Sequence, residues 1–147
     1  GVFSHTGSDS RYFNREGRYG DGGAYRDPNS PYRSWYDFDP KYKGGYRSWW
    51  GFETLPEVNE ETPSYVEFIT GEGGVIDTWL RRGAAGFRLD VADELPDEFI
   101  EKIRTAVKRV GPEKFLLGEM LTGAGVPLGE SRQIVTAYHN HLKGGTV

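Results

Sequence analysis

The chain has 147 residues, enough for one domain with a sizeable core but fewer than the roughly 200 to 250 residues of larger single-domain folds. Its formal net charge of −4 argues against a polyanion-binding surface, so we expect no nucleic-acid partner. The absence of cysteine excludes disulfides and a cysteine nucleophile. No apolar run approaches the roughly 18 residues of a membrane span, so we expect no membrane partner either.

The first 60 residues are rich in Gly, Pro, Asp, Ser and aromatic residues and show no sustained helical or alternating period. This composition predicts a long irregular segment, and such segments within a domain tend to be functional. We expect most of its rings to pack together as a small core of the segment itself. At Trp49 and Trp50 a sugar-stacking platform competes with that packing, because Gly51 beside them lets backbone approach a ligand.

Residues 61 to 120 have regular patterns of apolar residues, bounded by helix-start and helix-stop signals. The expected elements are helical structure from Pro63 to about Gly83 with a break at 71–74, a strand at 84–91, a helix at 96–110 and a strand at 115–120. This order of helix, strand, helix and strand is typical of the parallel register of an α/β fold.

Residues 121 to 147 lose that pattern, and a short helix over 131–142 is the one element expected there. His139 and His141 lie two positions apart, a spacing that can indicate a metal site. With no third ligand nearby, a solvated helix end is the expected structure, and we predict no metal site.

Two carboxylates stand out because they lie at the ends of strands that are otherwise apolar. Asp90 is in the first expected strand and Glu119 ends the second, and the carboxyl ends of such strands are where α/β active sites are built. On neighbouring strands, spaced roughly 4.8 Å apart, the pair would suit a nucleophile and a general acid/base. Arg88, on the same strand face as Asp90, could stabilise that anion. The alternative is a buried Arg88–Asp90 ion pair with Glu119 capping a loop, and spacing alone does not decide between the two.

Four segments resemble motifs of the α-amylase superfamily of glycoside hydrolases, and they occur in that family's order. They are Gly1–His5, similar to the end of its first motif; Leu55–Asn59, similar to the motif late in its inserted loop domain; Gly86–Glu94 (GFRLDVADE), similar to its nucleophile strand; and Leu116–Met120 (LLGEM), similar to its acid/base strand. The segment Tyr46–Gly51 (YRSWWG) and the Val91–Glu94 continuation are most similar to the neopullulanase, cyclomaltodextrinase and maltogenic-amylase branch.

The resemblance implies an α/β fold that is part of a (β/α)8 barrel, from the end of the third strand through the fifth, with an irregular inserted loop domain. Residues 1–60 would be that aromatic-rich loop domain, residues 61–120 the βα units of the catalytic barrel, and residues 121–147 a tail.

The resemblance also assigns roles in a retaining hydrolase of α-glucosidic bonds. Asp90 would be the nucleophile and Glu119 the general acid/base, with Arg88 stabilising Asp90. His5 would contact the sugar in subsite −1, and Glu94 would lie near the acceptor subsites. Trp50 would add a stacking surface for substrate.

The sequence also departs from the family pattern. The family's third carboxylate, in a His-Asp pair beyond the acid/base strand, has no match in the tail, and the aspartate that precedes the residue matching Gly1 is missing. Ser4 stands where many relatives have a calcium-binding asparagine, so we predict no calcium there and no other cofactor. These departures leave open whether the chain by itself is an enzyme.

The expected partner is an α-glucan oligosaccharide. A non-catalytic carbohydrate-binding module and an inactive truncated fragment are the alternatives to the enzyme. If the chain is complete as given, its two strands cannot close a barrel, and their unpaired edges would favour a homo-oligomer. Gly1 is not followed by a signal-peptide pattern, which leaves the compartment open with the cytoplasm favoured.

Overall fold

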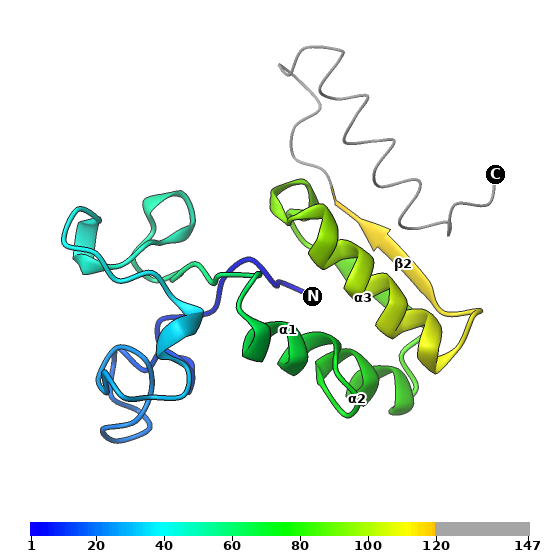
Figure 1. The fold of residues 1–147 in the computed structure, drawn as a ribbon, viewed down its shortest axis with the longest axis horizontal. Helices are drawn as coiled ribbons and strands as arrows, with labels where there is room; N and C mark the ends of the chain where they lie inside the picture. Colours follow the sequence, from blue (N-terminus) through cyan, green and yellow to red (C-terminus); the bar gives the residue numbers. More distant parts are fainter. Residues whose placement is uncertain (120–147) are drawn as a thin grey trace, which may run out of the picture. The chain divides into compact units, whose positions relative to one another are not determined.

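A computed structural model of the chain describes residues 1–119 (Figure 1). The described residues divide into two compact units: residues 2–65 form one, and Gly1 with residues 66–119 forms the other. No helix within residues 1–119 has both the length and the apolar character that crossing a membrane requires.

The unit of residues 2–65 is built from turns rather than long elements. Its regular pieces are three short 3-10 helices, η1 (Arg33–Trp35), η2 (Lys43–Gly45) and η3 (Trp49–Gly51), and the isolated antiparallel bridges His5–Glu57, Tyr36–Val58 and Ser48–Pro56. The prediction of an irregular segment is therefore confirmed for this part of the chain.

An aromatic core replaces secondary structure in holding this unit together. Phe13 is fully buried and meets Tyr36 at 4.8 Å and Tyr46 at 4.7 Å between ring centroids, and both of those rings are also buried. Asn14, also fully buried, bonds through its side-chain amide to the carbonyls of Gly20 and Gly22. Ring packing and the hydrogen bonds of a buried amide thus stabilise a unit that has few helical or strand hydrogen bonds.

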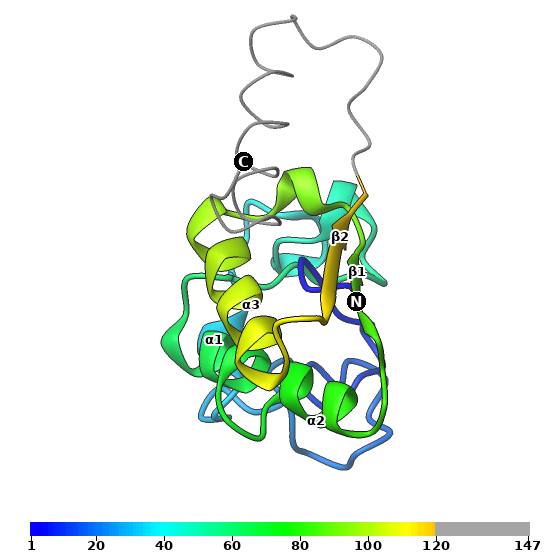
Figure 2. The same cartoon turned by 90° about the vertical axis from the view of Figure 1, so that its right-hand side faces the viewer.

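The second part of the chain has the alternating order that the sequence predicts. Its elements are α1 (Pro63–Thr70), α2 (Val75–Arg81), β1 (Gly86–Leu89), η4 (Ala92–Glu94), α3 (Asp97–Val110) and β2 (Phe115–Gly118). β1 and β2 pair in parallel, with Gly86 opposite Phe115 and Leu89 opposite Gly118. The predicted parallel register is confirmed, and Figure 2 shows α3 beside the two strands.

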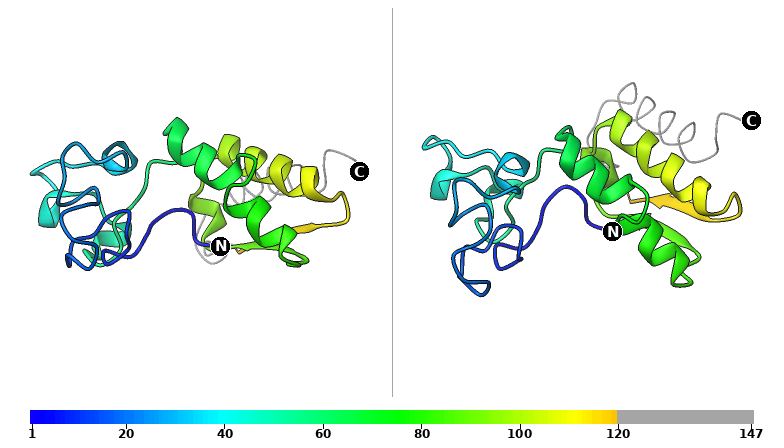
Figure 3. Two further views of the ribbon diagram at one scale, coloured as in Figure 1. Left: turned by 90° about the horizontal axis from the view of Figure 1, so that it is seen from below. Right: turned by 60° about the horizontal axis from the view of Figure 1, so that its bottom comes forward.

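The core of this unit lies between the helices and one face of the sheet. Strand residues alternate between faces, so Phe87, Leu89 and Leu116 are buried, whereas Arg88 and its neighbour Leu117 face away and are exposed. Figure 3 shows α3 running alongside α2. The helices contribute the buried side chains of Ile76, Leu80, Phe99, Ile100, Ile103, Ala106 and Val107.

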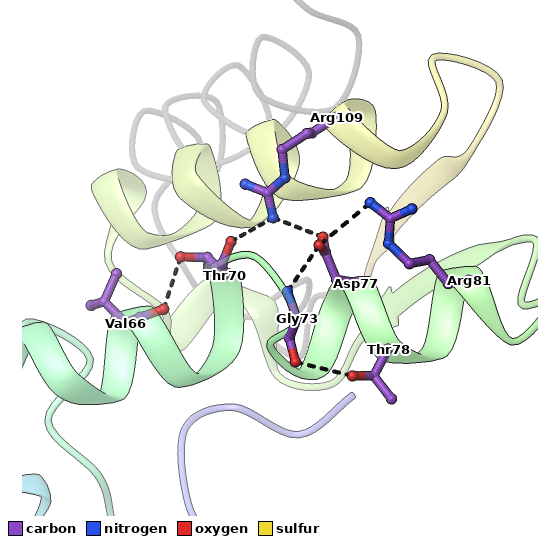
Figure 4. Close-up of polar contacts among 7 residues, drawn as sticks. All are labelled: Val66, Thr70, Gly73, Asp77, Thr78, Arg81 and Arg109. Carbon is purple, nitrogen blue, oxygen red and sulfur yellow. Dashed lines mark hydrogen bonds and ion pairs between the residues drawn. The ribbon is translucent and has the colours of Figure 1, made fainter.

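A buried carboxylate joins the ends of the three helices (Figure 4). The side chain of Asp77 in α2 is 2% exposed and accepts hydrogen bonds from Arg109 Nη2 at 2.7 Å and from the Gly73 N–H at 3.1 Å. Arg109, in the last turn of α3, also donates to the carbonyl of Thr70 at the end of α1. Burial raises the pKa of Asp77, but the hydrogen bonds from Arg109 and Gly73 and the charges of Arg109 and Arg81 outweigh it, so the pKa lies below its ordinary value.

Both strands end earlier than the sequence pattern predicts. The apolar run at 84–91 forms a strand only over Gly86–Leu89, and the run at 115–120 only over Phe115–Gly118. The reason in the first case is Val91, whose φ of 41° and ψ of 46° are left-handed and end the extended backbone. The helix expected over 131–142 and the histidines at 139 and 141 lie outside the described residues.

Candidate active site

Asp90 and Glu119 each occupy the position directly after a strand, rather than a position within it. Because Leu89 and Gly118 are paired, the residue that follows each strand lies at the same carboxyl end of the sheet. The Glu119 N–H donates to the Leu89 carbonyl at 2.9 Å, and the Ala92 N–H donates to the Glu119 carbonyl at 2.9 Å. The backbones that carry the two carboxylates are therefore tied together, as the parallel register predicts.

Arg88 binds both carboxylates with one guanidinium group. Its Nη1 lies 2.5 Å from Asp90 Oδ1, and its Nη2 lies 2.5 Å from Glu119 Oε1. The sequence predicts the Arg88–Asp90 contact but not the contact with Glu119. One planar cation thus fixes the spacing of two anions that would otherwise repel each other.

The three side chains are accessible to solvent. The exposed fraction is 47% for the Arg88 side chain, 31% for Asp90 and 34% for Glu119. The Arg88–Asp90 ion pair of the alternative forms, but it is accessible rather than buried. Glu119 shares the same guanidinium, and its Oε2 also accepts the N–H of Val91 in the following turn at 3.4 Å. Because the carboxyl groups of Asp90 and Glu119 are accessible from solvent, a substrate can reach them.

The backbone around Asp90 is held from two directions. The Gly1 amino group donates a hydrogen bond to the Arg88 carbonyl at 2.6 Å, and the Gly1 carbonyl accepts one from the Asp90 N–H at 2.9 Å, the pattern of a parallel pair on the other edge of β1. On the other side, the N–H of Val91 lies 3.4 Å from Glu119 Oε2. A β-branched residue in left-handed backbone costs roughly 1 to 2 kcal/mol, so these contacts hold a strained turn in place directly after Asp90.

Glu94 follows the two carboxylates in the chain and ends η4. Its side chain is exposed, and its N–H donates to the Val91 carbonyl at 3.0 Å. The left-handed turn at Val91 therefore connects Asp90 to the short helix that carries Glu94. Of the predicted site residues, Arg88, Asp90, Glu94 and Glu119 belong to this unit.

His5 and Trp50 belong to the unit of residues 2–65. His5 Nδ1 lies 2.9 Å from Ser4 Oγ, and the His5 ring stacks on Trp49 with centroids 4.9 Å apart. Trp49 in turn stacks on Trp50, at 4.5 Å and an interplanar angle of 13°. The sequence predicts a platform at Trp49 and Trp50, but it does not predict that His5 joins the stack.

Ser4 makes hydrogen bonds with two other residues of this unit. It is buried, its hydroxyl is shared with His5, and its carbonyl accepts the N–H of Val58 at 3.0 Å. Within residues 1–119, no group of three or more histidine, aspartate or glutamate side chains is arranged to hold a metal ion. The prediction that no calcium binds at Ser4 stays a prediction.

One residue of the candidate site, Val91, and one contact, that of Trp49 with His5, do not follow from the sequence pattern. Val91 reads as an apolar strand residue, and no local signal marks a left-handed valine, since Gly, Asn and Asp are the usual residues there. The contact of Trp49 with His5 joins residues 44 positions apart, so no local pattern predicts it.

Comparison with known proteins shows what the chain is similar to. No family model matches the chain. An amylopullulanase of Thermoanaerobacterium saccharolyticum is 35% identical over 94% of the chain, and neopullulanase 2 of Thermoactinomyces vulgaris is 28% identical over 81% of it. Among solved structures, the type III pullulan hydrolase of Thermococcus kodakarensis superimposes with a TM-score of 0.63 and 29% identity, covering 80% of this chain and 20% of that one.

These relatives are glycoside hydrolases whose solved members are (β/α)8-barrel enzymes, and the chain belongs to the same family, the α-amylase superfamily. A cyclomaltodextrinase and a maltogenic α-amylase are also among its relatives, which confirms the branch that the sequence motifs indicate. The chain spans 12% of the length of the amylopullulanase and 20% of the neopullulanase.

Proposed function

We propose that the chain carries the nucleophile and the general acid/base of a retaining glycoside hydrolase that cleaves α-glucosidic bonds in starch-derived oligosaccharides or cyclodextrins. In this proposal it forms part of a (β/α)8 barrel, from the end of the third strand through the fifth. The observation that carries the proposal is the Arg88 guanidinium, which binds Asp90 and Glu119 at the ends of two adjacent parallel strands. Retaining enzymes need two carboxyl groups about 5 Å apart, and a single cation touching both favours that closeness over the wider gap of inverting enzymes.

In the first step, Asp90 attacks the anomeric carbon of the bound sugar while Glu119, in its protonated form, gives its proton to the leaving glycosidic oxygen. The bond between that carbon and oxygen breaks, and a covalent ester joins the sugar to Asp90. Arg88 remains the cation beside Asp90, because protonation of Glu119 removes the charge that draws Arg88 toward it. The leaving part of the glucan departs with a new hydroxyl group.

In the second step, Glu119, now ionised, takes a proton from water, and the water oxygen attacks the anomeric carbon. The ester bond to Asp90 breaks, Asp90 returns as a carboxylate, and Glu119 is protonated again. Two displacements at one carbon restore the α-configuration. Both proton transfer and nucleophilic attack use carboxyl groups of this chain, so we propose no cofactor for these steps.

The remaining predicted residues bind substrate in this proposal. His5 contacts the glucosyl unit in subsite −1, Glu94 lies near the acceptor subsites, and Trp50 stacks against substrate. Support for an α-glucan as the substrate comes from the names of the relatives, which include amylopullulanases, a pullulan hydrolase and cyclomaltodextrinases.

The test is incubation of the purified chain with maltooligosaccharides and with cyclodextrin, with products followed by proton NMR from the first minutes. We expect the α-anomer to appear first and to mutarotate later, as retention requires. The Asp90→Asn and Glu119→Gln variants remove the nucleophile and the acid and should lower kcat by several orders of magnitude. Glu113→Gln, which changes an exposed glutamate in the turn before β2, is the matched control and should leave turnover unchanged.

A second candidate is a carbohydrate-binding module without catalysis, and the exposed Trp50 ring, stacked on Trp49, favours it. Glucan binding that Asp90→Asn leaves unaltered, together with no product from the parent chain, would support this candidate. An early β-anomer from the parent chain would instead overturn the retaining mechanism.

A further inference from the structure

The segment from Ser48 to Leu55 is a tight loop closed by backbone hydrogen bonds. The Phe52 N–H donates to the Trp49 carbonyl at 3.0 Å, and the Trp49 N–H donates to the Leu55 carbonyl at 2.9 Å. The Leu55 N–H donates back to the Phe52 carbonyl at 2.8 Å. The rings at the tip of this loop are therefore held on a fixed backbone.

Trp50 occupies a conformation that is unfavourable for its residue type. Its φ of 51° and ψ of 25° are left-handed, and Gly51 follows with a φ of 78°, so residues 49–52 form a turn of type I′. Asn-Gly and Gly-Gly are the usual central pairs of this turn, because a bulky side chain is strained there. Backbone strain at a large side chain is a mark of positions held for function.

The strained turn keeps the Trp50 indole stacked on Trp49 while most of its surface stays exposed. The two rings stack at 4.5 Å, yet 65% of the Trp50 surface is exposed. Phe52, at 54% exposure, flanks the pair with its ring 6.4 Å from that of Trp49. Trp49 also stacks on His5, with ring centroids 4.9 Å apart.

We propose that the outer face of Trp50 is a binding site for one glucosyl unit of an α-glucan, distinct from the unit that His5 contacts. This inference rests on the proposed function for the identity of the sugar. Trp49 stacks on both His5 and Trp50. A glucosyl unit that lies on the exposed Trp50 ring is therefore a different unit from the one that His5 contacts. The C–H face of a pyranose is apolar and matches an exposed indole in size, and a preorganised ring loses little freedom on binding. The site therefore favours longer glucans over short ones.

The test is calorimetric titration of the Asp90→Asn chain, which binds without turnover in the proposed mechanism, with maltohexaose and with maltose. Trp50→Asn removes the ring but keeps a residue that tolerates left-handed backbone, so the turn survives. We expect it to raise the Kd of maltohexaose about tenfold, the usual scale of one lost aromatic stacking partner, and to change maltose binding much less. Trp50→Phe restores a ring and should bind maltohexaose within about threefold of the parent.

Trp79→Ala is the matched control, because Trp79 is similarly exposed, at 53%, but lies in α2. Equal maltohexaose affinity in Trp50→Asn and the parent, or equal losses in Trp50→Asn and Trp79→Ala, would overturn the proposal. Failure of the proposed function is a separate result: the parent chain would release no product, while Trp50-dependent binding of maltohexaose would persist.

Discussion

Glu60 is a partly buried carboxyl group in the unit of residues 2–65, one position after the Leu55–Asn59 motif. Burial raises its pKa to about 7; its own backbone N–H and Arg47 act in the opposite direction, and Glu57 and Glu61 add to the rise. The unfolded chain ionises this group near pH 4.5, so stability from the protonated form is present below that pH and is lost as pH rises toward 7.

Glu60→Gln removes the ionisation and should make the chain more stable relative to the parent above pH 7 than at pH 4.5. Urea unfolding at the two pH values measures the difference. Glu61→Gln, at an exposed neighbouring position, is the control. An effect of Glu60→Gln that is identical at both pH values would contradict the burial argument.

The candidate site shows which residue roles can be predicted from sequence. Arg88 and Asp90 share a strand face through the two-residue period, so their contact follows from local geometry. The contact of Arg88 with Glu119 depends on how two strands align, and the left-handed Val91 opposes the intrinsic preference of valine. Tertiary structure imposes both, and neither leaves a local trace in the sequence.

At the scale of elements, the order and parallel pairing of β1 and β2 follow from periodicity and from glycine and proline at the boundaries. The buried ion pair between α2 and α3 does not. Asp77 lies in the first turn of α2 and Arg109 in the last turn of α3, and each charge is favourable there for the dipole of its own helix. The presence of either residue is therefore explained without a contact between them. Only the packing of α2 on α3 brings them to 2.7 Å.

Asp77→Asn should destabilise this helical part of the chain by about 2 kcal/mol at neutral pH, the usual scale of a lost hydrogen bond to a charged group. The pKa of Asp77 is lowered from 3.8, so its contribution is present above that pH and is lost as pH falls through the lower folded value. The difference between variant and parent should therefore shrink in acid. Denaturant unfolding at neutral pH and below pH 3.8 measures it, with the exposed Glu101→Gln of α3 as control. A pH-independent difference would mean that the Asp77 charge is not what stabilises the helices.

At the scale of the whole molecule, the proposed reaction needs one carboxylate from each of two successive strand ends, so the two roles can be separated chemically. In an Asp90→Gly variant, azide can enter the space of the missing carboxylate and attack an α-glucosyl fluoride once, which inverts the carbon and gives the β-glucosyl azide. In a Glu119→Ala variant, Asp90 still displaces fluoride, which needs no protonation, to form its ester, and azide then displaces Asp90 to give the α-glucosyl azide. NMR of the products distinguishes the two anomers, and the parent chain, which activates water, should give little of either. The same anomer from both variants would show that Asp90 and Glu119 do not divide the reaction into nucleophile and acid/base.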